Sequence, residues 1–369
     1  MRSETTFRRL RVALVPPLWA RVAPATQGGV EYIVYLLAEE LVRRGHEVTV
    51  FTSRDSPTTA RIEAVCEWNM IEAMERGCAS EYEYYETCNI AEVLRKSDSF
   101  DIVHFHVGGY AIPLGTLSRA PVVHTLHNPI TPDAIWLLER YPDATVTGVS
   151  RHQINAVPLG RRQSIRVIRN ACDFEAYELS LSPGNYLAFL GRMGPQKSPL
   201  DAIRIAKEAG FPIVLGGQPL DEDERAYFAE KIEPLINGID VIYVGQVDYR
   251  KKMELLKHAR ALLFPIQQDE AFGLVMIEAM ACGTPVIAFE RASVEEVVDF
   301  GKTGFYARSI QALSSFVPRA LTLDRKVVRD HARQRFGHAR MIDEYLQVYE
   351  SVLNATGMEQ PSLAPARHP

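Results

Sequence analysis

The stretch from residue 261 to residue 290, ALLFPIQQDEAFGLVMIEAMACGTPVIAFE, most constrains what this chain can fold into. It begins with a short apolar run over 261–264, which predicts a buried parallel strand. From Gly273 the apolar residues follow helical spacing until the Gly-Thr-Pro of 283–285, and a second buried strand is predicted over 286–289. A strand–loop–helix–strand unit of this kind indicates an α/β protein with a parallel sheet.

Two carboxylates flank the loop of this unit. Glu270 lies in the loop, and Glu278 lies in the predicted helix. The loop follows a strand and precedes a helix N-terminus, where backbone N–H groups and the helix dipole favour an anion. A carboxylate repels a phosphate but accepts hydrogen bonds from sugar hydroxyls. Either residue alone would be interpreted as a solvated charge, whereas the pair predicts a phosphate between sugar hydroxyls, which describes a nucleotide-sugar.

The run from Glu270 to Glu278, followed by AMACGTPVIA, resembles the E-x7-E signature of the retaining glycosyltransferases of family 4. The resemblance implies the GT-B fold, in which two Rossmann-like, doubly wound domains face each other across a cleft. It implies that the C-terminal domain holds most of a nucleotide-diphosphate-sugar donor. At the start of the helix, the donor-binding residues expected from it are Phe272, Gly273, Leu274 and Val275.

Composition is compatible with a two-domain globular enzyme. The chain has 369 residues, more than a single core normally supports, with 47% apolar and 24% charged residues. A net charge of -5 gives no reason to expect nucleic acid as a partner. The five cysteines form no C-x-x-C, so neither a disulfide framework nor a zinc site is indicated. The basic N-terminus precedes only a short apolar run, which is interpreted as a first strand, and the expected compartment is the cytoplasm.

Both halves of the chain alternate strand and helix patterns, which predicts two doubly wound domains. The first half opens with a strand, a Gly-Gly turn, a helix and a second strand, whereas residues 58–98 are expected to be helical. A Ser-Pro-Gly-Asn turn at 182–185 marks the change of domain. The predicted units are an acceptor-side domain over 1–180, a donor domain over 181–336, a helix over 337–355 that packs back on the first domain, and a disordered tail over 356–369.

A glycine-rich loop with two cations follows the first strand of the second half. Glycine allows close approach of the backbone to a ligand. Arg192 offers a planar guanidinium that can donate two hydrogen bonds to a diphosphate, and Lys197 offers a compact ammonium. The loop matches the family's G-R-x(n)-K motif at Gly191, Arg192 and Lys197. Ser198 departs from it, because glycine is usual there. The alternative is a solvated loop with two surface cations.

Further site residues come from the resemblance. It places Gly28 and Gly29 at the cleft, facing the donor phosphates and the acceptor. It places His127, at the end of a predicted strand, against the donor sugar, whereas His124 is interpreted as structural. The segment with Gln246 and Val247 is expected to contact the base. The tyrosine cluster Tyr82, Tyr84 and Tyr85 is interpreted as a packing surface, with an acceptor contact as the lesser alternative.

Two patterns could suggest a metal. His104 and His106 end a strand, but no third ligand accompanies them. Asp221 and Asp223 match a D-x-D motif, but they open a helix, where acidic residues complement the helix dipole. We therefore expect no metal and no cofactor, the nucleotide-diphosphate-sugar being a substrate.

The resulting prediction is a retaining, metal-independent glycosyltransferase. Arg192 and Lys197 would bind the diphosphate, Glu278 the ribose and Glu270 the donor sugar. The acceptor would be a sugar, a lipid or a small molecule. Membrane contact would be peripheral at most and would involve a basic group. The simpler interpretation of this group is a solvated basic face. It consists of Arg161, Arg162, Arg166 and Arg169. The alternatives are a nucleotide-sugar epimerase or phosphorylase of the same fold, or a non-catalytic sugar-binding protein.

Overall fold

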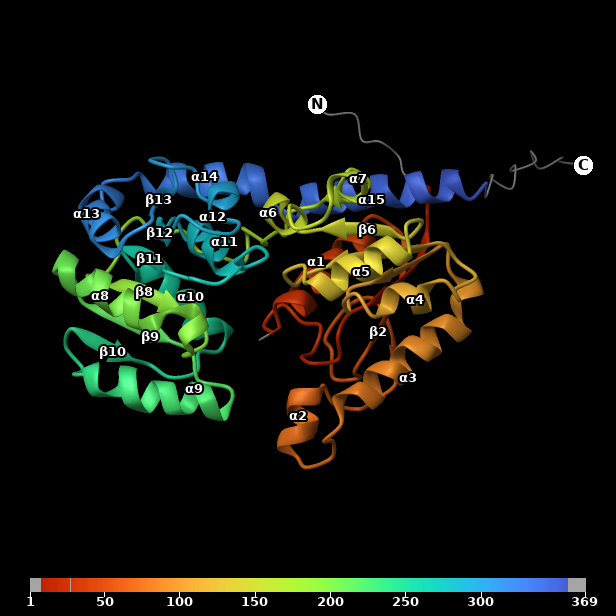
Figure 1. The fold of residues 1–369 in the computed structure, drawn as a ribbon, viewed down its shortest axis with the longest axis horizontal. Helices are drawn as coiled ribbons and strands as arrows, with labels where there is room; N and C mark the ends of the chain where they lie inside the picture. The colour runs from red at the N-terminus through yellow and green to blue at the C-terminus, as the bar shows by residue number, and fades with distance from the viewer. Residues whose placement is uncertain (1–7, 27, 358–369) are drawn as a thin grey trace, which may run out of the picture.

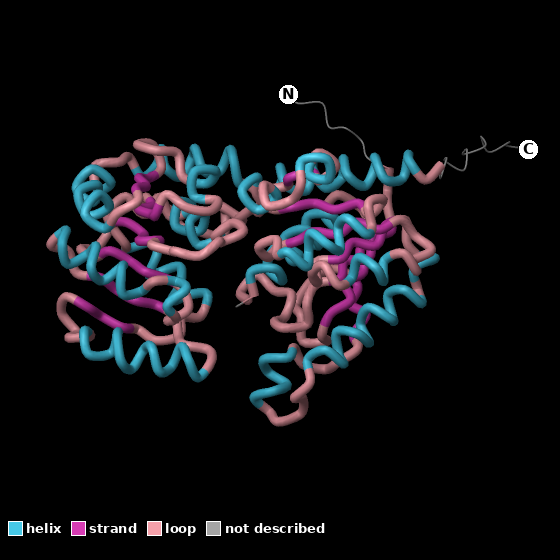
Figure 2. Tube along the Cα trace, viewed as in Figure 1, coloured by secondary structure: helices cyan, strands magenta, loops and turns pink. Residues whose placement is uncertain are grey.

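The computed structural model describes residues 8–26 and 28–357 of the chain. These residues form two lobes, and each lobe contains one parallel sheet flanked by helices (Figures 1 and 2). The predicted α/β class with two doubly wound domains is confirmed. The predicted disordered tail falls almost entirely on residues 358–369, which lie outside the described residues.

The first sheet has seven strands in the order β3-β2-β1-β4-β5-β6-β7, and every neighbouring pair is parallel. Its strands are β1 (Arg11–Val15), β2 (Glu47–Thr52), β3 (Arg61–Ala64), β4 (Ile102–Phe105), β5 (Val122–Leu126), β6 (Thr145–Gly148) and β7 (Arg166–Val167). The helices of this part of the chain are α1 (Gly29–Arg43), α2 (Met70–Glu75), α3 (Tyr82–Arg95), the 3-10 turn η1 (Ser97–Ser99), α4 (Ala111–Gly115), α5 (Pro132–Arg140), α6 (Arg151–Ile154) and α7 (Leu159–Arg162).

The second sheet has six parallel strands in the order β10-β9-β8-β11-β12-β13. They are β8 (Leu187–Leu190), β9 (Ile213–Gly216), β10 (Val241–Tyr243), β11 (Ala261–Phe264), β12 (Val286–Phe289) and β13 (Gly304–Ala307). Its helices are η2 (Pro195–Lys197), α8 (Pro199–Ala209), α9 (Glu222–Tyr227), η3 (Phe228–Ile232), η4 (Glu233–Leu235), α10 (Tyr249–His258), α11 (Leu274–Ala281), α12 (Val294–Val297), α13 (Ile310–Ala320) and α14 (Arg325–Phe336). The expected strands over 261–264 and 286–289 are confirmed residue for residue.

The expectation that residues 58–98 are helical is wrong in part, because β3 lies within them at the edge of the first sheet. The strand has the sequence RIEA and is exposed or only partly buried, and its four residues are too few for their alternation to stand out as a strand signal. Its pairing with β2, in which Thr49 opposes Arg61, supplies the hydrogen bonds that the local sequence does not signal. The helix that Asp221 opens is also short, and residues 222–235 form three successive helical pieces.

The last helix, α15 (His338–Ala355), follows the second sheet but packs on the first lobe (Figure 1). Its buried face, which includes Tyr345 and Tyr349, shares one apolar core with α1, β1 and β2. The chain crosses between the lobes twice at adjacent points, since the N–H of Cys172 donates to the carbonyl of Phe336 at 3.0 Å. No helix within residues 8–26 and 28–357 is both long and apolar enough to cross a bilayer.

The strand order of each sheet reverses direction at one point. In the first sheet this point lies between β1 and β4, and in the second between β8 and β11. In open parallel sheets, ligands bind outside the carboxyl ends of the strands at such a switch point, because the flanking loops diverge there. The segments that follow β1, β8 and β11 contain Gly28, Gly191 and Glu270, so the topology places these predicted site residues at the two switch points.

Candidate active site

Lys197 and Glu270 meet at the switch point of the second sheet. Lys197 ends the turn η2 after β8, and Glu270 lies in the loop after β11. The ammonium of Lys197 is paired with the carboxylate of Glu270, and both side chains are about a quarter exposed. The predicted cation and the predicted sugar-binding carboxylate are therefore neighbours that solvent, and hence a ligand, can reach.

Arg192 has a partner that the sequence did not indicate. Its guanidinium lies 3.2 Å from Glu224, a carboxylate of α9 that is only 1% exposed. Glu224 also accepts a hydrogen bond from the N–H of Leu220 at 2.9 Å. The side chain of Arg192 is 41% exposed. The buried Glu224 therefore holds the position of Arg192, while part of the Arg192 side chain remains open to solvent.

Ser198 shows why glycine is expected at its position. It adopts a left-handed conformation with φ 55° and ψ 47° between η2 and α8. A β-carbon is strained in this region by about 1–2 kcal/mol. The serine departs from the family motif but retains the backbone geometry that glycine would favour.

Glu278 is buried at 5% exposure on α11, and two side chains hold it. The hydroxyl of Tyr177 donates to its Oε1 at 2.9 Å, and the ammonium of Lys252 donates to the same atom at 2.5 Å. Tyr177 comes from the crossover segment and Lys252 from α10. Because both donors use Oε1, the other carboxylate oxygen is left for a further hydrogen bond, such as one from a ribose hydroxyl.

The start of α11 differs in part from the expectation. Gly273 has φ 82°, and a β-carbon there would lie 2.8 Å from the ring of Phe264, so only glycine fits. Leu274 and Val275 are partly exposed at the first turn. Phe272 is buried, and its ring packs edge-on against that of Phe336 in the core. Its side chain is therefore not at the surface, where the expected donor contact would require it.

The loop with Gln246 and Val247 lies at the same edge of the second sheet. The N–H of Gly217 donates to the carbonyl of Gly245 at 2.8 Å, which ties the loops after β9 and β10 together. A β-carbon at Gly217 would lie 1.9 Å from the carbonyl oxygen of Gly191. These contacts bring Val247 and the exposed Gln246 to the side of the loop that contains Arg192.

The Gly-Gly turn faces the other lobe. Gly28 and Gly29 lie at the start of α1, and a β-carbon at Gly29 would lie 3.2 Å from Leu274 on α11. A β-carbon at Gly28 would lie 2.0 Å from Glu31, whose carboxylate accepts from the N–H of Ala20 at 2.9 Å. Burial raises the pKa of Glu31 to about 7. Glycine at both positions thus allows two close approaches, one within the lobe and one between lobes.

His127 follows β5 and pairs with His106, which follows β4. The Nδ1 of His106 lies 2.9 Å from the Nε2 of His127. Burial lowers the pKa of His127 to about 3, so its ring is neutral at neutral pH. His124 is 3% exposed and its ring stacks on Phe105, which agrees with the structural role expected for it.

Three polar contacts join the lobes beside Glu270. The ring of His152 lies 3.5 Å from Asp269, and the N–H groups of Arg151 and His152 donate to Glu296 at 3.0 and 2.6 Å. The loop that holds Glu270 therefore approaches the first lobe through Asp269, and α12 makes the other two contacts.

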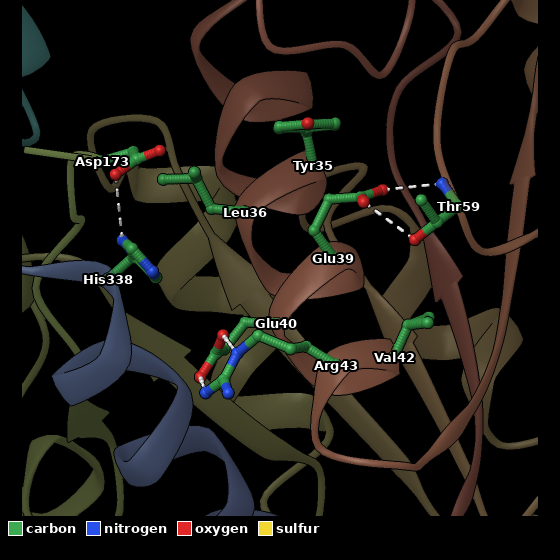
Figure 3. Close-up of a pocket in the computed structure, with 9 residues that line it drawn as sticks. All are labelled: Tyr35, Leu36, Glu39, Glu40, Val42, Arg43, Thr59, Asp173 and His338. Atoms are coloured by element: carbon green, nitrogen blue, oxygen red, sulfur yellow. Dashed lines mark hydrogen bonds and ion pairs between the residues drawn. The ribbon is translucent and has the colours of Figure 1, made fainter. Parts of the chain in front are cut away.

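The pocket in Figure 3 lies elsewhere. It measures about 430 Å³ and lies between the C-terminal half of α1 and the two crossovers, near Asp173 and His338. Glu39 and Glu40 in its wall are bound by threonines and by arginines of the first lobe. None of the predicted site residues lines this pocket.

The patterns that suggested a metal have structural explanations. The carboxylate of Asp221 caps α9 by accepting from the N–H of Glu224 at 2.8 Å. His104 has both ring nitrogens bonded, one to Tyr349 and one to Thr125. Among residues 8–26 and 28–357, no group of three or more His, Cys, Asp or Glu is arranged to hold a metal ion.

The four arginines of the basic group that was considered for membrane contact each bond or approach other residues of the protein. Arg161 donates to carbonyls that include Ala144, and Arg162 donates to Asn155. Arg166 is bonded to Gln347 of α15, and Arg169 lies 3.6 Å from Glu296. Of the four, Arg169 is near a carboxylate, whereas the other three are bonded to neutral groups of the protein.

The sequence did not point to Tyr177, Lys252 or Glu224, because each lies far along the chain from the residue it contacts. The nearness of His106 to His127 could have been predicted. Both residues follow strands, and the carboxyl ends of neighbouring parallel strands meet at one edge of a sheet.

Comparison with protein families matches residues 27–176 to Glycosyltransferase Family 4 and residues 177–335 to Glycosyl transferases group 1. A D-inositol 3-phosphate glycosyltransferase of Mycolicibacterium smegmatis is 25% identical over 428 aligned positions, which cover 98% of this chain and 95% of that one. An uncharacterized 41.2 kDa protein in the cps region of Klebsiella pneumoniae is 27% identical over 224 residues, 57% of this chain and 59% of that one.

Solved structures agree with the fold. AviGT4, a glycosyltransferase involved in avilamycin A biosynthesis, has a TM-score of 0.70 and 25% identity, covering 94% of this chain and 98% of that one. Anabaena Alr3699/HepE in complex with UDP-glucose has a TM-score of 0.70 and 18% identity, covering 93% of this chain and all of that one. Both share the two-lobed architecture described above.

Proposed function

The chain belongs to the glycosyltransferases of group 1 and family 4, and on that premise we propose that it is a retaining, metal-independent transferase. It transfers a sugar from a nucleotide-diphosphate-sugar to an acceptor hydroxyl. The observation that carries the proposal is the contact between Lys197 and Glu270 at the switch point of the second sheet. A cation and a carboxylate side by side suit a substrate that carries a diphosphate next to a sugar.

The donor would lie along this edge with a role for each neighbouring group. Arg192 and Lys197 bind the diphosphate, together with the N–H groups near Gly273 and Leu274. The free Nζ–H groups of Lys197 can reach a phosphate while one still bonds Glu270, because an ammonium has three donors. Since the leaving diphosphate gains charge as the glycosidic bond breaks, these cations stabilise the transition state more than the ground state.

The carboxylates and the remaining residues would bind the nucleoside and the sugar, which are the two ends of the donor. Glu278 accepts from the ribose hydroxyls and Glu270 from the sugar. Gln246 and Val247 contact the base, and His127 contacts the far side of the sugar. Gly28 and Gly29 allow the first lobe to approach the phosphates.

The proposed chemistry is attack on the same face that the diphosphate leaves. The bond from the anomeric carbon to the phosphate oxygen breaks, and a bond from that carbon to the acceptor oxygen forms. The acceptor proton passes to the leaving phosphate oxygen, so no base on the protein and no metal is required. The acceptor is a sugar, a lipid or a small molecule, and the reaction takes place in the cytoplasm.

A thermal-shift panel of nucleoside diphosphates and nucleotide-sugars tests the proposal, because a ligand that prefers the folded state raises the melting temperature. At a hundredfold excess over its Kd, the correct donor stabilises the fold by about 2.7 kcal/mol. UDP-glucose, which HepE binds, is the first probe. No shift with any nucleotide would contradict the proposal.

Turnover on the best donor separates the alternatives. Conversion of the donor's sugar without an acceptor would indicate an epimerase, and release by inorganic phosphate would indicate a phosphorylase. Saturable binding without turnover over a panel of acceptors would indicate a sugar-binding protein. Product with the donor's anomeric configuration and undiminished rate in EDTA is the expected result.

A further inference from the structure

Two imidazoles, the buried His106 and the partly buried His127, share one hydrogen bond beside the proposed sugar site. β4 and β5 are parallel neighbours in which Phe105 opposes His124, so the residues that follow both strands emerge at one edge of the sheet. The rings of His106 and His127 lie with centroids 5.2 Å apart and planes inclined by 28°. Among the described residues, the only hydrogen bond of these two rings joins Nδ1 of His106 to Nε2 of His127 at 2.9 Å.

The second ring nitrogen of His106 has no partner within the part of the chain that the structure describes. His106 is 2% exposed, and its Nε2 has no hydrogen-bond partner among the described residues. The nearest ring, that of His104 at 4.0 Å between centroids, cannot serve it. Both nitrogens of His104 are already occupied, Nδ1 by the hydroxyl of Tyr349 at 2.8 Å and Nε2 by Thr125 at 2.7 Å.

Both rings of the pair are neutral at neutral pH. Burial lowers the pKa of His106 well below its ordinary value and that of His127 to about 3. Each neutral imidazole has one N–H and one bare nitrogen. The shared hydrogen bond must therefore contain one proton, which belongs either to Nδ1 of His106 or to Nε2 of His127.

The unpartnered Nε2 of His106 distinguishes between these two positions of the proton. If His127 donated, His106 would place its N–H at Nε2, where a buried donor would have no acceptor. If His106 donates, only a bare nitrogen is left there. Among backbone groups, buried N–H donors without acceptors are rarer in proteins than buried acceptors that lack a donor. The same preference, applied to the ring, makes the unpartnered nitrogen the bare one. We infer that His106 is a positioning residue that donates Nδ1–H to His127 and holds it as the Nδ1–H tautomer.

This tautomer determines what His127 can recognise. With Nε2 occupied by His106, the nitrogen that remains for a ligand is Nδ1, and it carries the proton. His127 then presents a neutral N–H donor, which suits an oxygen acceptor such as a sugar hydroxyl or a phosphate oxygen. This catalytic consequence rests on the proposed function, whereas the tautomer itself is a property of the ligand-free chain.

Nitrogen NMR of the full chain with 15N-labelled histidine tests the inference directly, since two-bond proton correlations distinguish protonated from bare ring nitrogens. The signals of His127 are identified by their loss in His127→Asn. The expected wild-type spectrum shows His127 with a protonated Nδ1 and a bare Nε2. A proton on Nε2 of His127 would overturn the inference.

Two variants of His106 provide a matched comparison. His106→Asn places an amide donor near the position of Nδ1 and should keep His127 in the Nδ1–H form. His106→Leu fills similar space without a donor, and the signals of His127 should move toward a mixture of tautomers. An unchanged His127 spectrum in His106→Leu would overturn the inference, and His124→Gln, which alters a different buried histidine, should leave that spectrum unchanged.

The same variants give a kinetic readout on a donor that the thermal-shift panel identifies. His106→Leu should lose at least tenfold in kcat/KM, and His106→Asn should recover most of it. Equal loss in both variants would show a packing role instead. Because the NMR experiment needs no ligand, a failed tautomer assignment and a failed donor assignment give different results.

Discussion

At the scale of single residues, the candidate site depends on pairs that bring opposite charges together. Lys197 with Glu270, Arg192 with Glu224, and Lys252 with Glu278 each join different loops or helices of the second lobe. Glu224 and Glu278 are buried acids, whereas Glu270 is partly exposed. Glu224 therefore positions Arg192, whose side chain is 41% exposed, whereas Lys197 and Glu270 form a pair in which both members are partly exposed.

Lys197→Ala and Glu270→Ala should each lower transfer by at least a hundredfold, about 2.7 kcal/mol in activation free energy. The reason is that each removes a group expected to bind the donor more tightly in the transition state. Melting temperatures should stay close to wild type, since an ion pair this exposed contributes only about 0–1 kcal/mol. Lys326→Ala, at an exposed position on α14, is the control with unchanged turnover. Near-wild-type kcat/KM in both site variants would remove these assignments.

Ala292→Gly should stabilise the protein by about 0.5–1 kcal/mol. Ala292 has φ 54°, and relief of this left-handed conformation outweighs the larger chain entropy of glycine in the unfolded state. Ala91→Gly, at an exposed position within α3, should instead destabilise by about 1 kcal/mol. Urea titration measures both, and equal destabilisation by the two changes would refute the expectation.

At the scale of elements, α15 connects the end of the chain to the core of the first lobe. The hydroxyl of Tyr349 bonds the buried His104, and that of Tyr345 lies 3.2 Å from Thr125 of β5. The helix therefore supplies both apolar area and hydrogen bonds to the strands that precede the two paired histidines.

Tyr349→Ala should cost about 3–5 kcal/mol of stability, because it leaves a cavity in a fully buried site. Tyr349→Phe keeps the ring and should cost about 1–3 kcal/mol, since it leaves a nitrogen of His104 unpaired. Hydrogen exchange checks the location: protection should fall in β4 and β5 and stay unchanged in β11 and β12. Equal loss in both sheets would mean that α15 stabilises the lobes as one unit.

At the scale of the whole molecule, buried titratable groups make stability depend on pH. Burial lowers the pKa of His124 to about 3, and the rings of His104 and His106 are lowered in the same direction. Burial raises the pKa of Glu31 to about 7, which acts in the opposite sense. The histidines bind fewer protons when folded than when unfolded, and Glu31 binds more.

Stability should therefore fall as pH decreases below 6.5, where unfolded histidines become protonated and the folded ones do not. One such histidine contributes a slope of about 1.4 kcal/mol per pH unit down to its folded pKa. Glu31 contributes the opposite slope between its ordinary pKa and about 7. His124→Gln should reduce the acid slope by about 1.4 kcal/mol per pH unit in urea titrations at several pH values. An unchanged slope would show that His124 does not remain neutral when folded.

The sequence by itself determined which segments become strands and helices where apolar periodicity is strong, as over 261–264 and 286–289, and it marked Gly273, where only glycine fits the turn. It missed β3, because a four-residue edge strand is specified by its neighbour and not by its own pattern. The family also followed from one local signature, the E-x7-E run from Glu270 to Glu278.

Only the tertiary structure decided which side chains meet. Lys252 and Tyr177 lie on different segments from Glu278, and Glu224 lies far along the chain from Arg192, so no spacing within the sequence joins them. The pairing of His106 with His127 depends on the order of strands in the first sheet. Contacts of this kind arise because parallel strands bring distant loops to one edge, and strand order is fixed by long-range packing rather than by local pattern.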